Sequence, residues 1–121
     1  MELQKLPYSF TICKPVRAAD IATDAEFVFW ARTDRELSLV CQTKDAPADT
    51  VERDDGWRGF RVQGVLDLSL VGVLSALSGI LAEHNIGLFA LSTYDTDTIL
   101  VKEADFDRAM DALARAGYTI L

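Results

Sequence analysis

The sequence predicts an α+β fold built from two ferredoxin-like βαββαβ units in tandem, with antiparallel sheets and an abbreviated first unit. Three observations lead to this prediction: two segments of helical periodicity, apolar strand-like runs around them, and an internal similarity between the two halves. A chain of 121 residues can form one ordinary core or two small, mutually dependent ones. We therefore expect an abbreviated unit at residues 1–60 and a complete unit at residues 61–121.

The first helix is expected to begin at Ser69, which is a plausible N-cap residue. Asn85 is expected to end it in a left-handed conformation, with Ile86 supplying the hydrophobic contact that accompanies such an ending. The apolar residues that recur at helical spacing are Leu70, Val73, Leu74, Leu77, Ile80 and Leu81.

The second helix is expected over Ala104 to Ala116, with acidic residues near its start and Arg115 near its end, as the helix dipole favours. Gly117 is the expected C-cap. Strand-like segments lie at 59–64, at 118–121 and in a hairpin at 88–101. The resulting order, strand, helix, strand, strand, helix, strand, is the split βαβ motif.

The hairpin at 88–101 is apolar on both faces, because Ile99 and Val101 point one way and Leu100 points the other. A sheet with one wet face alternates apolar and polar residues. We therefore expect the second face to be covered as well, by the first half of the chain, by a second subunit, or by both.

The first half contains an echo of this hairpin. Residues 27–40 align without gaps on residues 88–101, so that Asp34 matches Asp95 and Glu36 matches Asp97. A strand is expected at 8–13 and a hairpin at 27–41, but residues 44–50 hold a proline and allow only about a turn of helix. Residues 57–64 are expected to form one continuous strand that ends the first unit and begins the second.

Composition excludes several functions. The formal net charge of −7 disfavours nucleic acids and anionic membrane surfaces, because binding to phosphates depends on Lys and Arg. The N-terminus does not resemble a signal peptide and no apolar stretch would span a bilayer, so we expect a cytoplasmic protein. Cys13 and Cys41 lie in strand-like patterns and are expected to be buried thiols. We expect no metal site and no cofactor.

Two polar segments in the second half could form a binding site. One is the turn before the first helix, at residues 65–72, and the other is the hairpin turn with Ser92, Thr93, Asp95 and Asp97. A helix N-terminus suits a carboxylate, whereas acidic turn residues suit an ammonium or guanidinium group. If the two segments meet, within one chain or across a dimer, they would complement both poles of an amino acid.

The segments 66–72, 81–97 and 99–103 resemble the ACT domain family of βαββαβ regulatory modules, and in particular the tandem ACT units of CASTOR-type arginine sensors and aspartate kinases. This resemblance implies a non-catalytic, allosteric amino-acid-binding module with its ligand held at an interface between ACT units. It also implies a homodimer, because those sensors have four ACT units. The ligand-binding residues that it implies are Asp67, Ser69, Leu70, Val71, Gly72, Ser92, Thr93, Tyr94, Asp95 and Asp97.

Two other functions fit the same residues. One is a structural or interaction homodimer without a small-molecule ligand, in which Asp95 and Asp97 serve only as turn residues. The other is an enzyme in which these two carboxylates hold a divalent cation. The enzyme is disfavoured, because no glycine-rich phosphate loop, activated nucleophile or nearby base accompanies the pair.

Overall fold

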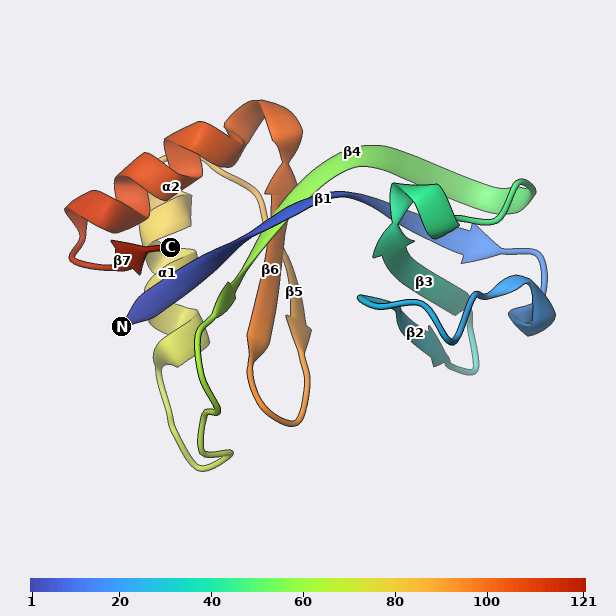
Figure 1. Cartoon of the computed structure of the whole chain (residues 1–121), viewed down its shortest axis with the longest axis horizontal. Helices are drawn as coiled ribbons and strands as arrows, with labels where there is room; N and C mark the ends of the chain where they lie inside the picture. The colour runs from blue at the N-terminus through green and yellow to red at the C-terminus, as the bar shows by residue number, and fades with distance from the viewer. The chain divides into compact units, whose positions relative to one another are not determined.

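The computed structural model describes the whole chain, Met1 to Leu121, as two compact units. The helical unit comprises residues 1–7 and 58–121, and the inserted unit comprises residues 8–57. Strands β1 (Glu2–Pro15) and β4 (Thr50–Val62) are long and contribute residues to both units (Figure 1). The expected continuous strand at residues 57–64 corresponds to the end of β4. The expected domains at 1–60 and 61–121 stay a prediction.

In the helical unit the sheet contains β1, β4, β6 (Asp97–Lys102) and β5 (Phe89–Ser92), in that order, and β7 (Thr119–Ile120) pairs with β1. Hairpin β5–β6 is antiparallel, but β7 runs parallel to β1, with Leu3 opposite Ile120. The N-terminal strand thus lies between β4 and β7, where a simple βαββαβ unit would pair its first and last strands. The antiparallel sheet of the prediction fits the β5–β6 hairpin, and the pairing of β1 with β7 adds one parallel edge to it.

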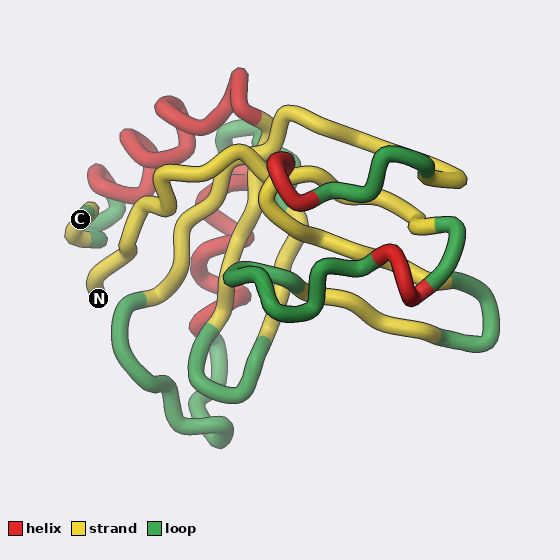
Figure 2. Tube along the Cα trace, turned by 45° about the vertical axis from the view of Figure 1, so that its right-hand side comes forward, coloured by secondary structure: helices red, strands yellow, loops and turns green.

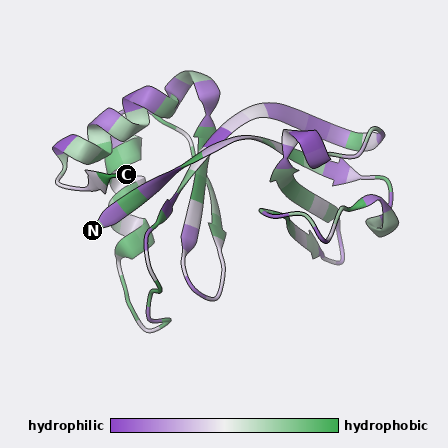
Figure 3. Cartoon of the chain, in the orientation of Figure 1, coloured by the Kyte–Doolittle hydropathy of each residue, from purple (hydrophilic) through white to green (hydrophobic).

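Helices α1 (Val73–Glu83) and α2 (Phe106–Arg115) pack against one face of this sheet, as Figure 2 shows. Neither has the length and apolar character that crossing a membrane requires. Figure 3 shows α2 with mixed hydrophilic and hydrophobic surfaces, whereas α1 is largely hydrophobic. The buried side chains between helices and sheet are Leu3, Phe60, Val62, Leu77, Leu81, Ile86, Ile99, Val101, Phe106, Ala109, Met110 and Leu113.

Helix α1 begins at Val73 rather than at the expected Ser69. The Asp67 carboxylate accepts hydrogen bonds from the Ser69 amide (2.8 Å) and hydroxyl (2.7 Å), which holds residues 67–69 in a local turn instead of a helix. Gly72, with φ 83°, is the residue from which the helix starts. A short side chain that bonds to the nearby backbone therefore outweighs the apolar periodicity.

The end of α1 is as expected. Asn85 has φ 56°, its amide donates to the carbonyl oxygen of Ala82 (3.0 Å), and the Ile86 amide donates to that of Leu81 (2.9 Å). This is the Schellman arrangement, and Ile86 is buried beside it.

Helix α2 ends in the same way. Gly117 has φ 106°, and the Tyr118 amide donates to the carbonyl oxygen of Leu113 (3.1 Å).

Strand β6 is buried on both faces at Ile99, Leu100 and Val101, each 0% exposed, as its apolar residues on both faces predict.

The inserted unit contains β2 (Phe29–Arg32), β3 (Leu37–Gln42) and parts of β1 and β4, in the order β2-β3-β1-β4. It has no α-helix, and short 3₁₀ turns stand at Ala18–Asp20 (η1) and Thr43–Asp45 (η2), while η3 (Glu103–Asp105) precedes α2 in the helical unit. Cys13, Ile21, Leu39 and Cys41 form its small buried cluster.

The β2–β3 and β5–β6 hairpins have the same construction. Phe29 lies opposite Val40, as Phe89 lies opposite Leu100. In one turn the Thr33 amide donates a hydrogen bond to the carbonyl oxygen of Glu36, and in the other the Thr93 amide donates to that of Thr96, both at 2.9 Å.

Phe29 therefore corresponds to Phe89, whereas the ungapped alignment matches it with Ala90. That alignment is wrong by one residue. Such a slip would move every side chain of a strand to the opposite face.

Candidate functional site

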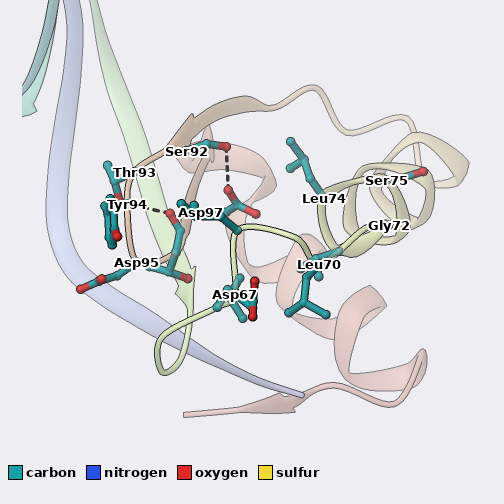
Figure 4. Close-up of a pocket in the computed structure, with 14 residues that line it drawn as sticks. Asp67, Leu70, Gly72, Leu74, Ser75, Ser92, Thr93, Tyr94, Asp95 and Asp97 are labelled. Atoms are coloured by element: carbon teal, nitrogen blue, oxygen red, sulfur yellow. Dashed lines mark hydrogen bonds between the residues drawn. The ribbon is translucent and has the colours of Figure 1, made fainter.

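A pocket of about 280 Å³ lies in the helical unit, where the loop between β4 and α1 meets the turn of the β5–β6 hairpin. Figure 4 shows this loop and the first turn of α1 on one side and the hairpin on the other. The residues that line it are Leu66, Asp67, Leu68, Leu70, Gly72, Val73, Leu74, Ser75, Ser92, Thr93, Tyr94, Asp95, Thr96 and Asp97.

Two hydrogen bonds position the hairpin turn beside the chain that leaves β4. The amide of Leu66 donates to the carbonyl oxygen of Asp95 at 2.6 Å, and the Thr96 hydroxyl donates to the carbonyl oxygen of Val62 at 2.7 Å. Both bonds join segments that are distant in sequence. The two polar segments identified from the sequence therefore meet within a single chain.

The N-terminus of α1 opens on the pocket without a side-chain cap. Gly72 has no side chain to offer, and the first intrahelical bond runs from the Ala76 amide to its carbonyl oxygen (2.9 Å). The amides of Val73, Leu74 and Ser75 thus precede that bond, and all three residues line the pocket. Unsatisfied amides at a helix N-terminus attract anions such as a carboxylate. Because α1 begins at Val73 and not at Ser69, the free amides of its first turn are those of residues 73–75.

Acidic groups face the pocket from the hairpin. The half-buried Asp97 accepts a 2.6 Å hydrogen bond from the Ser92 hydroxyl through Oδ1, which leaves Oδ2 available. Figure 4 shows this pair on the side of the hairpin nearer to α1, whereas Tyr94 and Asp95 lie on the farther side. Tyr94 is 80% exposed. Asp97 is therefore better placed than Asp95 to meet a ligand that also contacts the helix.

A third carboxylate lines the pocket from the loop. The Ser69 amide and hydroxyl donate to Asp67, and these bonds lower the pKa of its carboxyl group. No Lys, Arg or His lines the pocket, so its side chains are purely anionic or neutral. The structure has no group of three or more His, Cys, Asp or Glu side chains arranged to hold a metal ion. The arrangement favours an organic cation that also carries an anionic group.

Most of the residues expected at the site line this pocket, namely Asp67, Leu70, Gly72, Ser92, Thr93, Tyr94, Asp95 and Asp97. Ser69 bonds to Asp67 instead, and Val71 lines a neighbouring groove. The lining residues that sequence reasoning missed are Leu66, Leu68, Val73, Leu74, Ser75 and Thr96. Misplacing the helix start hid the first turn of α1, because residues 73–75 then appear to lie in the helix interior.

Residues 52–115 match the ACT domain family model. The chain is also similar to the crystal structure of protein Atu0741 from Agobacterium tumefaciens, with 33% identity over 99% of this chain and 91% of that one, and a TM-score of 0.85. This protein therefore belongs to the ACT domain family. ACT domains are generally regulatory modules that bind ligands.

More distant solved structures share the fold alone. One is a Vibrio cholerae protein of unknown function, described as a possible transport protein (TM-score 0.73, 20% identity, 94% of this chain and 88% of that one). Another is aspartate kinase from Clostridium acetobutylicum, with a TM-score of 0.64 and 12% identity. The match covers 94% of this chain and 33% of the kinase chain. A search of curated proteins found no match.

Proposed function

We propose that the protein is a non-catalytic regulatory module that binds an amino acid in the pocket between the 66–72 segment and the β5–β6 hairpin. The observation that carries the proposal is the pairing of an uncapped helix N-terminus with available carboxylates across one small pocket. A pocket of about 280 Å³ suits a small metabolite rather than a polymer.

In this proposal the α-carboxylate of the ligand accepts hydrogen bonds from the amides of Val73 to Ser75. The cationic end of the ligand pairs with Asp97, whose free oxygen offers a charge-assisted bond. Because three Asp side chains and no cationic side chain line the pocket, the charge balance favours an amino acid with a basic side chain, such as L-arginine or L-lysine.

A homodimer completes the proposal. The pocket opens to solvent at exposed residues such as Tyr94 and Leu68, so a second subunit could cover its mouth and place the ligand at an interface between ACT units. The matching hairpins support the interpretation of the inserted unit as part of an abbreviated N-terminal ACT-like unit. A ligand held between subunits would stabilise their association and so bias which partner the protein meets.

Thermal unfolding in the presence of each of the twenty amino acids tests this function. At about 100 times the dissociation constant, a ligand adds about 2.7 kcal/mol to the stability of the folded state, which raises the melting temperature measurably. We expect the largest increase with L-arginine or L-lysine. Unchanged melting with all twenty, together with no heat in calorimetric titrations, would contradict amino-acid binding.

A structural homodimer without a ligand is the second candidate, and α1 favours it. Glu83 is the only charged residue of this helix, and its exposed positions otherwise carry Ser75, Ala76, Gly79 and Ala82. A helix with so little polar surface is typical of one that is covered.

Sedimentation of the wild type and of Ala82→Glu measures this association directly. A wild-type dimer that Ala82→Glu dissociates, with no response to any amino acid, would support the structural function. A monomeric wild type would reject it.

A further inference from the structure

We propose that residues 67–71 form a lid that closes over the pocket when an amino acid occupies it, pivoting at Gly72. This inference rests on the proposed function and describes how the same site holds its ligand. In Figure 1 the lid belongs to the loop that joins β4 to α1, below the helix in that view.

The pivot is a glycine in a conformation that other residues rarely adopt. Gly72 has φ 83°, and a Cβ atom built on it would meet no atom within 4 Å. Glycine is therefore required there by the backbone and not by close packing. It is also the N-cap of α1, so that rotation about its backbone moves the lid without disturbing the helix.

The lid is held together internally but has few bonds to its surroundings. Within the lid, Ser69 donates hydrogen bonds to the Asp67 carboxylate, and the Leu70 amide donates one to the Asp67 carbonyl oxygen (3.0 Å). The nearest bond to another element lies just before it, from Leu66 to the hairpin residue Asp95. A segment bonded mainly to itself, between a fixed anchor and a glycine pivot, can move as one piece.

The side chains of the lid are unusually apolar for an exposed loop. Leu68 is 71% exposed and Leu70 is 54% exposed, although both line the pocket, and Val71 is 90% exposed. Figure 3 shows hydrophobic stretches in this loop. Closure onto an amino acid would remove Leu68 and Leu70 from water and exclude water from the charged contacts of the ligand, which strengthens them.

Closure would also change a second feature of the helical unit. Val71 lines a neighbouring apolar groove, together with Val73, Ala76, Ile80 and Tyr118. Gly72 and Val73 border both the pocket and this groove. Movement of the lid would therefore withdraw Val71 from the groove wall, so that occupancy of the pocket is transmitted to a different part of the surface.

Hydrogen–deuterium exchange of the full chain, measured by mass spectrometry, tests the lid with L-arginine and L-lysine as probes. In the free protein we expect amides 67–71 to exchange much faster than those of β6. At a saturating concentration of the probe that binds by calorimetry, their exchange should slow about tenfold or more, as expected for a segment whose opening requires release of the probe. The turn at residues 33–36 should be unchanged.

Gly72→Ala is the variant of choice, and Gly56→Ala is its matched control. Gly56 has φ 82° and equally open space around it, but it lies in the inserted unit and does not line the pocket. We expect Gly72→Ala to lose the protection of the lid and to bind the probe about tenfold more weakly, a change of about 1.4 kcal/mol. Gly56→Ala should retain both.

The outcomes separate the lid from the proposed function. Calorimetric binding with unchanged exchange at 67–71 would overturn the lid alone, as would amides 67–71 that are already as protected as β6 in the free protein. Equal loss of affinity in Gly72→Ala and Gly56→Ala would also overturn it. No heat with any of the twenty amino acids would overturn the proposed function and the lid together.

Discussion

The backbone amide of Leu66 lies 2.6 Å from the carbonyl oxygen of Asp95, and this hydrogen bond joins the loop before α1 to the turn of the β5–β6 hairpin. It brings a helix N-terminus and an acidic turn to the walls of one pocket. Because both partners are backbone groups, the contact depends on the fold and tolerates changes of the two side chains.

The hairpin acids can therefore be changed with little effect on folding, in contrast to the core. Leu77 is 0% exposed between α1 and the sheet, so Leu77→Ala should lower the free energy of unfolding by about 2–5 kcal/mol. Asp95→Ala should change it by about 0.5 kcal/mol or less, as is usual for surface residues. Urea unfolding of the two variants measures the difference. Similar midpoints would contradict the assigned inward face of α1.

A second prediction concerns acid stability in the inserted unit. The fully buried Thr11 hydroxyl donates a 2.5 Å hydrogen bond to Asp55, and Arg53 pairs with the same carboxylate. The Thr11 bond is the main cause that lowers the pKa of Asp55. A carboxyl group whose pKa is lower in the folded state stabilises the fold at pH values above its unfolded pKa of about 3.9, and this contribution is lost as the pH falls through the folded pKa.

Thr11→Val should therefore destabilise the protein more at pH 7 than at pH 2 to 3, values that bracket the titration range of an Asp. Denaturant unfolding at both pH values gives the two differences. The hydroxyl of Thr11 also contacts Thr43, so Thr43→Val serves as a control for the part of the loss that does not depend on pH. A loss for Thr11→Val that is the same at both pH values would show that the bond does not favour the ionised form of Asp55, and would contradict its lowered pKa.

The two cysteines should be inert in the folded protein. Burial raises the pKa of Cys41 to about 11 and also raises that of Cys13. Since only the thiolate reacts, a pKa of about 11 leaves about one Cys41 in a thousand reactive at pH 8. Reaction with a thiol reagent such as dithionitrobenzoate should be slow in buffer and rapid in denaturant. Rapid labelling of the native protein would contradict the burial of both side chains.

Local sequence patterns predicted the helices and the hairpin well, because their determinants are close in sequence. The end of α1 follows from Asn85 and Ile86, and that of α2 from Gly117. The predicted start of α1 at Ser69 is wrong because the Asp67 side chain accepts a hydrogen bond from the Ser69 amide and so favours a turn over a helix. The spacing of apolar residues carries no information about this competing bond.

The missed features depend on contacts between distant residues. The start of β1 pairs with the last strand of the chain, with Glu2 opposite Thr119 and Leu3 opposite Ile120, and no local pattern reveals a partner so far away. Pro7 further weakens the strand signal there. The two walls of the candidate site could be named from residue types, but their meeting within one chain is a consequence of sheet order.

Asp97 should determine which ligands bind. Asp97→Ala should lower the affinity for L-arginine by about tenfold or more, which corresponds to the 1.5–3 kcal/mol typical of a hydrogen bond to a charged group. Neutral amino acids should be affected much less, because their side chains do not engage the carboxylate. Asp34→Ala, in the turn of the β2–β3 hairpin, is the control and should leave affinity unchanged. An equal loss for basic and neutral amino acids would reject the charge pairing.

Titration of ¹⁵N-labelled protein with L-arginine and L-lysine, followed by NMR, tests the central claim most directly because it locates the ligand residue by residue. We expect the largest saturable shifts at the amides of Val73, Leu74 and Ser75, with further shifts at Asp97, and none at residues 33–36. Unchanged spectra with both amino acids, or saturable shifts confined to other parts of the chain, would contradict an amino-acid site at the N-terminus of α1.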